Sequence, residues 1–120
     1  MPEFSPSERE LLDKTDEVGI ETRAGRQLPI WVVVVGDTAY IRSVRGIEGR
    51  WYQALLGGTE ARLHAGSAVW TIASEQVTDA DEIERVSDAF KTKYEQRWPQ
   101  PTAAMLRPSV LPTTMRISPA

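Results

Sequence analysis

The segment Pro29-Ile30-Trp31-Val32-Val33-Val34-Val35-Gly36-Asp37 carries the strongest strand signal in the chain. Its six central residues are apolar and mostly β-branched, and a proline and a glycine bound the run. Because consecutive positions are apolar, we expect this strand to be covered on both faces. The pair Gly36-Asp37 then predicts a tight turn, with residues 39–44 returning as the second strand of a hairpin.

Strand patterns extend outward from this hairpin in both directions. They predict four more strands, at residues 18–23, 61–65, 68–74 and 113–117. We therefore expect a mainly β, α+β fold built on a six-stranded antiparallel barrel, because closing a small sheet removes its exposed edges. A chain of 120 residues has room for one such domain, spanning residues 1–120.

Helices are expected to flank the barrel. In the N-terminal helical segment 1–16, Ser5 and Glu8 have the spacing of a capping box. A short helix is predicted after Gly49, and a long one from Asp79 to the Trp98-Pro99 pair. The proline-rich segment 99–112 is predicted to be irregular.

Composition excludes several classes of function. The chain has 17 acidic and 14 basic residues and a net charge of −3, so we expect no nucleic-acid partner. It has no cysteine and a single histidine, His64, and helix capping accounts for its acidic cluster at residues 79–82, so we expect no metal site. Neither a signal peptide nor a membrane-length apolar run is present, which favours a cytoplasmic protein without a membrane partner.

The candidate binding residues lie in Arg42-Ser43-Val44-Arg45-Gly46-Ile47-Glu48-Gly49-Arg50-Trp51-Tyr52. This stretch holds three arginines and one acid at a predicted strand-to-helix junction. Arginine side chains, a serine hydroxyl and free helix N–H groups are the donors that bind phosphate or carboxylate, and glycines permit close approach of the backbone. An alternative is a solvated turn in which the arginines pair with Glu48 or Glu21. Trp51-Tyr52 fits the core better than the wall of a ring-binding cleft, although both remain open.

The same residues carry a resemblance to known proteins. The Ile30–Val34 strand, the Gly36-Asp37 turn, Tyr40-Ile41-Arg42-Ser43 and the Trp51-Tyr52-Gln53-Ala54-Leu55 segment resemble the split β-barrel flavoproteins. The broad relatives are the pyridoxamine-phosphate oxidase-like proteins, and the nearer ones are the deazaflavin-dependent nitroreductases. Over nearly its full length, the chain resembles a family of small bacterial proteins catalogued as domain of unknown function 2255.

This resemblance implies a cofactor and a partner. It implies a homodimer with FMN or the deazaflavin coenzyme bound at the subunit interface. Ser43, Arg45, Gly46 and Arg50 would surround the cofactor phosphate with help from Arg42. The ring would lie along the strand around Ile30 to Val32, with Trp31 and Trp51 at its border.

Three hypotheses of function follow from these observations. The first is an oxidoreductase that uses a flavin or deazaflavin, which suits a chain poor in catalytic side chains because the cofactor carries the chemistry. The second is a non-enzymatic domain that binds a phosphorylated or carboxylated small molecule. The third is a structural dimeric barrel without a ligand. No catalytic residue is assigned in any of them.

Overall fold

The computed structural model describes residues 3–23 and 25–120 of the chain, so residues 1–2 of the predicted N-terminal helical segment lie outside it. The strands are β1 (Val18–Thr22), β2 (Leu28–Ile30), β3 (Val33–Val35), β4 (Thr38–Ile41), β5 (Ala61–Ala65), β6 (Ala68–Gln76) and β7 (Met115–Pro119). The helices are α1 (Pro6–Lys14), α2 (Arg50–Leu56), α3 (Ala80–Phe90) and α4 (Pro99–Met105). Shorter helical turns are η1 (Gly46–Glu48), the π-helical turn η2 (Lys91–Glu95) and η3 (Leu111–Thr113).

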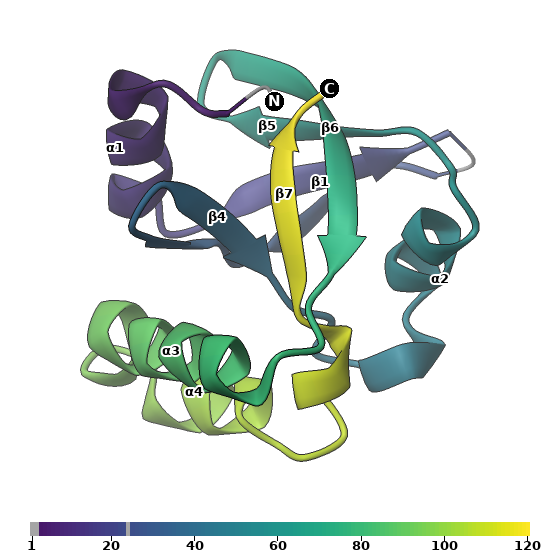
Figure 1. The fold of residues 1–120 in the computed structure, drawn as a ribbon. Coiled ribbons are helices and arrows are strands. Elements are labelled where there is room, and N and C mark those ends of the chain that lie inside the picture. The colour runs from purple at the N-terminus through teal and green to yellow at the C-terminus, as the bar shows by residue number, and fades with distance from the viewer. Residues whose placement is uncertain (1–2, 24) are drawn as a thin grey trace.

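The strands form one antiparallel sheet in the order β2-β1-β5-β6-β7-β4-β3. Its two end strands, β2 and β3, are consecutive in the chain, so the sheet curls until both of its ends meet in one segment. Figure 1 shows α3 and α4 together at one end of this curled sheet, with α1 and α2 on opposite sides. This arrangement confirms the mainly β barrel with flanking helices.

The strand count differs from the six predicted because the apolar run divides between β2 and β3. At the break, the Val32 N–H donates to the Tyr94 hydroxyl at 3.3 Å, and the Val32 carbonyl accepts from Lys93 Nζ at 2.7 Å. Backbone groups that leave a sheet need other partners, and these two side chains of η2 supply them. The run can therefore bend at Trp31-Val32 and pair with β1 on one side and β4 on the other.

Two apolar clusters cover the two faces of this run. Val32 belongs to the cluster inside the barrel, and Val33 belongs to the cluster between the barrel and α3, η2 and α4. Both side chains are almost fully buried. The expectation that this strand is covered on both faces is confirmed.

The start of α1 follows a local sequence signal. Ser5 accepts the Glu8 N–H at 3.2 Å and donates its own N–H to the Glu8 carboxylate at 2.7 Å, which confirms the capping box of α1.

The prediction of an irregular segment at 99–112 is wrong, because α4 begins at Pro99. Proline is tolerated in the first turn of a helix, where its missing N–H has no partner to lose. In residues 3–23 and 25–120, no helix has the length and apolar character needed to cross a membrane.

Candidate functional site

A cavity of about 730 Å³ opens between the β1–β2 hairpin, the segment that follows β4, and α4. We call it the arginine cavity because four arginines and one acid, Glu17, line it. The arginines are Arg26, Arg42, Arg45 and Arg50. In a chain whose net charge is negative, this is a local excess of positive charge.

Three of these guanidinium groups are exposed at the cavity. Arg45 immediately precedes η1, and Arg50 is the first residue of α2, so both follow the end of β4. Arg26 reaches the same cavity from the connection between β1 and β2. An arginine fork binds phosphate or carboxylate through two parallel N–H donors, so this arrangement has the chemistry of an anion site.

The alternative of a turn held by local ion pairs does not describe these arginines. Neither Arg45 nor Arg50 forms an ion pair with any residue in the described ranges, Glu48 included. Glu21 instead contacts the His64 ring on the neighbouring strand, with 2.8 Å between Oε1 and Nε2. The two guanidinium groups therefore keep their N–H donors available to a ligand.

Arg42 lies in a different environment from the other three. Its side chain is buried, with 1% of the residue exposed. Nε donates to Thr114 Oγ1 at 2.9 Å, and the two terminal nitrogens donate to the carbonyls of Met105 at 3.1 Å and Ile83 at 2.9 Å. The guanidinium also lies over the Phe90 ring, 5.2 Å from its centroid. Arg42 thus joins the end of β4 to α3, α4 and the start of β7.

Burial sets both the charge state and the role of Arg42. Removal from water lowers the pKa of its guanidinium from 12.5 to about 10, so the group stays charged at neutral pH. Each of its three nitrogens already donates within the protein, and two N–H groups of the five remain. Arg42 lines the cavity, where it contributes positive charge from below the surface, while its principal contacts are structural.

Ser43 and the two glycines of the predicted anion loop mainly hold the loop together. The buried Ser43 hydroxyl donates to the Gly46 carbonyl at 2.9 Å, so its proton is directed into the loop. Gly46 does not line the cavity, and a side chain there would meet the Ser109 carbonyl at 3.2 Å. A side chain at Gly49 would lie 2.3 Å from Ser43 Oγ. The structure therefore separates Gly46 from the other predicted binding residues.

Apolar side chains line the same cavity as the arginines. Ile30, Trp31 and Trp51 all line it, as predicted, and all three are half-buried. Trp31 stacks on Tyr94, with ring centroids 3.8 Å apart and planes inclined by 7°. The stack fixes the indole orientation, so the wall offers a rigid aromatic surface to a ligand.

Sequence reasoning missed part of this cavity. Arg26 lies sixteen positions before Arg42, and only the β1–β2 pairing brings it to the same opening. Pro101 and Met105 of α4 close another side. The prolines at 99 and 101 followed by Thr102-Ala103-Ala104-Met105 were a usable helix signal, since proline is favoured at a helix start.

Over the described ranges, no group of three or more His, Asp or Glu is placed to hold a metal ion.

Comparison with solved structures supports the fold assignment. The chain is similar to a "Putative Pyridoxamine 5'-phosphate oxidase" from Listeria innocua, with 14% identity, a TM-score of 0.63, and coverage of 92% of this chain and 88% of that one. It is similar to a "putative 5-nitroimidazole antibiotic resistance protein" from Bacteroides thetaiotaomicron, with 16% identity, a TM-score of 0.56, and coverage of 99% and 81%. It is also similar to the FAD and heme binding protein from Mycobacterium smegmatis, with 20% identity, a TM-score of 0.56, and coverage of 98% and 66%.

These structural likenesses agree with the split β-barrel expected from the sequence. No curated protein matches the chain. The model of the family described as "Uncharacterized protein conserved in bacteria (DUF2255)" matches residues 10–117, which is most of the sequence. The chain belongs to this family.

Proposed function

We propose that the arginine cavity binds a flavin-type cofactor and that the protein uses it as an oxidoreductase. The observation that carries this proposal is the pairing of Arg26, Arg45 and Arg50 with an apolar, aromatic wall in one cavity. Flavin nucleotides have the same two parts, a phosphate and a flat ring. The volume of about 730 Å³ lies within the range of pockets that hold small molecules and cofactors.

The phosphate end would lie at the exposed arginines. Arg45 and Arg50 are adjacent in the folded chain through the short η1 turn, and both are free of ion pairs to described residues. Arg26 approaches from the opposite hairpin. The buried charge of Arg42 adds to the positive potential, because charges in a low-dielectric environment are weakly screened. Two or three arginine forks around a phosphate give a strong and orientation-specific contact.

The ring end would lie against Ile30, Trp31 and Trp51. These side chains exclude water from one side of the cavity, and Met105 and Pro101 of α4 close another. When bound, a flavin or deazaflavin supplies hydride-transfer chemistry that side chains lack. The chain would bind the cofactor, orient its ring and exclude water. Among the described lining residues Glu17 is the sole acid, and we assign no residue to proton transfer.

The names of similar structures support the cofactor class. One solved protein of this fold is named as FAD and heme binding, and another is named for pyridoxamine 5′-phosphate oxidase. A third is named for resistance to 5-nitroimidazole antibiotics. FMN is the form we propose first, and the deazaflavin coenzyme is the other member of the class.

A second copy of the chain is the partner we propose. Val44 lines the cavity and is 52% exposed, and Ile47 in the η1 turn that follows is 57% exposed. Large apolar side chains exposed together favour contact with another protein surface. A dimer that covers them would also complete the wall of the cavity, so dimerisation and cofactor binding should be linked.

The proposal is tested by titrating the purified protein with FMN and, separately, with the deazaflavin coenzyme, followed by absorbance and fluorescence. We expect a dissociation constant of roughly micromolar for one of them, and at least a ~100-fold loss in Arg45→Ala/Arg50→Ala, because two charge-assisted contacts contribute about 1.5–3 kcal/mol each. Arg85→Ala/Arg107→Ala removes two exposed arginines outside the cavity and should bind like the parent.

Failure to bind either cofactor at about 50 µM, well above a micromolar dissociation constant, would overturn the proposal. Equal binding by the parent and the Arg45/Arg50 variant would overturn the placement of the phosphate. Binding of pyrophosphate without either cofactor would favour the non-enzymatic anion-binding alternative. Failure to bind any of the three ligands would favour a structural dimer.

A further inference from the structure

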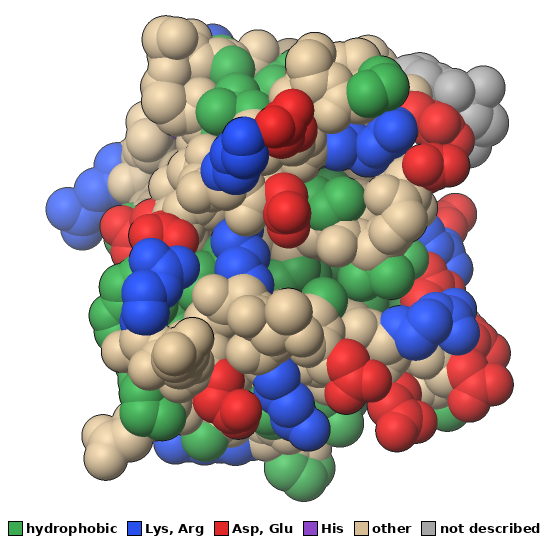
Figure 2. Space-filling view, turned by 90° about the vertical axis from the view of Figure 1, so that its left-hand side faces the viewer, with side chains coloured by type: hydrophobic (Ala, Val, Ile, Leu, Met, Phe, Trp, Pro, Cys, Tyr) green, Lys and Arg blue, Asp and Glu red, His purple; other side chains and the backbone are tan. Residues whose placement is uncertain are grey.

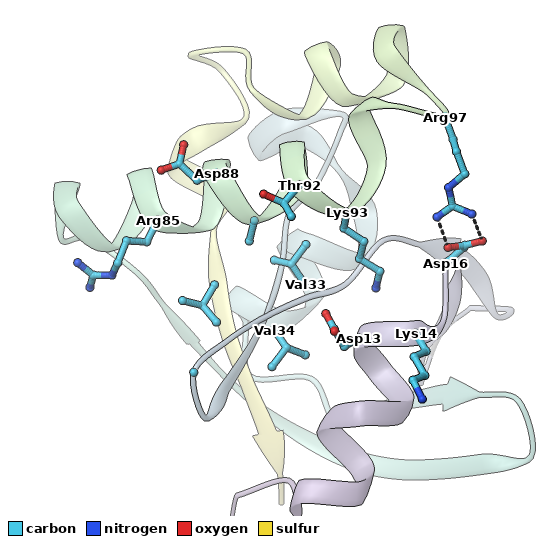
Figure 3. A pocket seen from close by; sticks show the side chains of 13 residues that line it. Asp13, Lys14, Asp16, Val33, Val34, Arg85, Asp88, Thr92, Lys93 and Arg97 are labelled. Atoms are coloured by element: carbon cyan, nitrogen blue, oxygen red, sulfur yellow. Dashed lines mark hydrogen bonds and ion pairs between the residues drawn. The ribbon is translucent and has the colours of Figure 1, made fainter.

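A second cavity lies on the other side of the Trp31-Val32 break and has a volume of about 830 Å³. It is an open groove between α1, β3 and the α3–η2 helix (Figure 3) and shares no lining residue with the arginine cavity. Figure 2 looks onto this side of the molecule, where acidic and basic side chains alternate around apolar ones. Its charged lining residues include Asp13, Asp16, Lys93 and Arg97, and its apolar ones include Val33 and Val34.

Lys93 has an unusual position in this groove. Its Nζ donates to the Leu12 carbonyl at 2.9 Å and to the Val32 carbonyl at 2.7 Å. Leu12 belongs to the last turn of α1, whose carbonyls lack partners within the helix. Within the described part of the chain, no carboxylate lies within ion-pair distance of Lys93. The amine is therefore held in place by neutral acceptors alone.

This pair of acceptors suits a neutral amine as well as an ammonium ion. A neutral lysine amine has two N–H groups and one lone pair. The two carbonyls can take both N–H groups, which leaves the lone pair unused. An amine in this state is a positioned nucleophile at the side of a cavity.

The charged side chains that act on the Lys93 amine are Asp13, Asp16 and Arg97, and two of them pair with each other. Asp16 is bound by Arg97, with distances of 2.8 and 2.5 Å between the paired atoms (Figure 3). The Asp13 carboxylate points toward the Lys93 amine from α1 (Figure 3). β3 contributes only valines, and the neighbouring Tyr94 hydroxyl shares the Val32 carbonyl.

These surroundings enlarge the neutral fraction of the amine, although the ammonium form still predominates at pH 7. Burial lowers the pKa of Lys93 from 10.5 to about 8, although Asp13 and Asp16 oppose this shift. At pH 7 such a lysine has roughly 300 times the neutral fraction of an ordinary one. In contrast, Lys14 pairs with Glu10 at 2.6 Å, and this hydrogen bond raises its pKa.

We propose that Lys93 is a covalent site for a small uncharged aldehyde, which binds in the groove and condenses reversibly with the amine to form an imine. The amine lone pair attacks the carbonyl carbon, and the carbonyl π pair moves to oxygen. A proton passes from nitrogen to that oxygen, giving a carbinolamine. Loss of the hydroxyl group as water then forms the C=N bond, so one water is released and nothing is oxidised or reduced.

The residues around Lys93 account for the chosen ligand class. The Asp13 carboxylate points toward the amine but lies beyond ion-pair distance, so it would accept the proton from nitrogen and return it to the leaving hydroxyl group through one water. The same carboxylate disfavours an anionic ligand, while Val33, Val34 and Ala89 favour a small apolar one. This inference does not depend on flavin binding, since the two cavities are separate.

The test is reductive trapping of the folded parent protein with propanal and cyanoborohydride at pH 7, followed by peptide mass mapping. The chain has three lysines, so Lys14 and the exposed Lys91 are internal references. We expect Lys93 to be alkylated at least ~10 times faster than either, since its neutral fraction is larger. We also expect its rate to saturate with propanal concentration and the preference to vanish in urea.

Matched variants complete the test. Lys91→Arg, on the same helical turn, should leave alkylation of Lys93 unchanged. At about pH 9, where the amine is mostly neutral with or without the Asp13 charge, Asp13→Asn should slow alkylation of Lys93 at least several-fold without changing alkylation of Lys91. Equal rates at the three lysines would overturn the proposal. A Lys93 rate that is fast but strictly proportional to propanal concentration would also overturn it, because the groove would then hold no aldehyde.

Discussion

Replacement of Arg42 by methionine should loosen the helical layer from the barrel. Methionine retains the apolar stem of arginine and removes the guanidinium, so the change tests the three hydrogen bonds more than the packing. Those bonds reach Ile83 in α3, Met105 in α4 and Thr114 before β7, which are 41, 63 and 72 positions away along the chain. No single neighbouring residue can replace them.

The expected loss of stability can be worked from these contacts. Three hydrogen bonds from a charged donor contribute about 1.5–3 kcal/mol each. The lowering of the Arg42 pKa to about 10 reflects burial of the charge, which costs roughly 3 kcal/mol. The difference is about 1.5–6 kcal/mol, and we expect a loss near 3 kcal/mol, within this range.

Urea unfolding followed by tryptophan fluorescence measures this loss. Arg42→Lys keeps the charge but has no planar fork to reach three acceptors, so it should recover less than half of the loss. Arg85→Met removes an exposed arginine of α3 and should change the free energy of unfolding by less than about 0.5 kcal/mol. An Arg42→Met protein as stable as the parent would refute the reasoning and show that the buried charge costs as much as its hydrogen bonds return.

Two further perturbations have directions fixed by the structure. Hydrogen bonds from Arg116 lower the pKa of Glu82 below its ordinary value of 4.5, so the stabilising effect of Glu82 is complete above pH 4.5 and is lost as the pH falls below it. Glu82→Gln should lower the free energy of unfolding at pH 7 by about 1–3 kcal/mol and flatten its fall between about pH 5 and 3. An unchanged pH profile of stability would contradict this. Gly49→Ala would place a Cβ 2.3 Å from the buried Ser43 Oγ and should destabilise the protein by about 1–3 kcal/mol in thermal unfolding. The control Gly57→Ala, whose Cβ would have ordinary contacts at 3.5 Å, should be nearly neutral. Equal effects of the two substitutions would show that the loop moves aside.

Local patterns predicted the elements that depend on nearby residues. The apolar run at 30–35 indicated a strand covered on both faces, and Val32 and Val33 do enter the two separate clusters. The bend between them was not predictable from the run itself. It depends on Lys93 and Tyr94, more than sixty positions away, which bind the Val32 backbone.

The candidate site shows the same division between local and distant information. Arg42, Arg45 and Arg50 look alike in sequence, and only Arg45 and Arg50 keep their charges at the surface. Strand alternation places Arg42 on the face opposite Ile41, but the burial of that face by α3 and α4 is a tertiary fact. Arg26 reaches the cavity only through the pairing of β1 with β2.

The central claim is that the exposed arginines of the cavity hold the phosphate of a flavin nucleotide. A thermodynamic cycle with FMN and riboflavin, which lacks the phosphate, tests it most directly in the parent and in Arg45→Ala/Arg50→Ala. We predict that the parent binds FMN at least ~100 times more tightly than riboflavin, and that this ratio falls at least ~10-fold in the variant, in which Arg26 and Arg42 remain. The same ratio in both proteins would contradict the claim, because the phosphate would then lie away from these arginines.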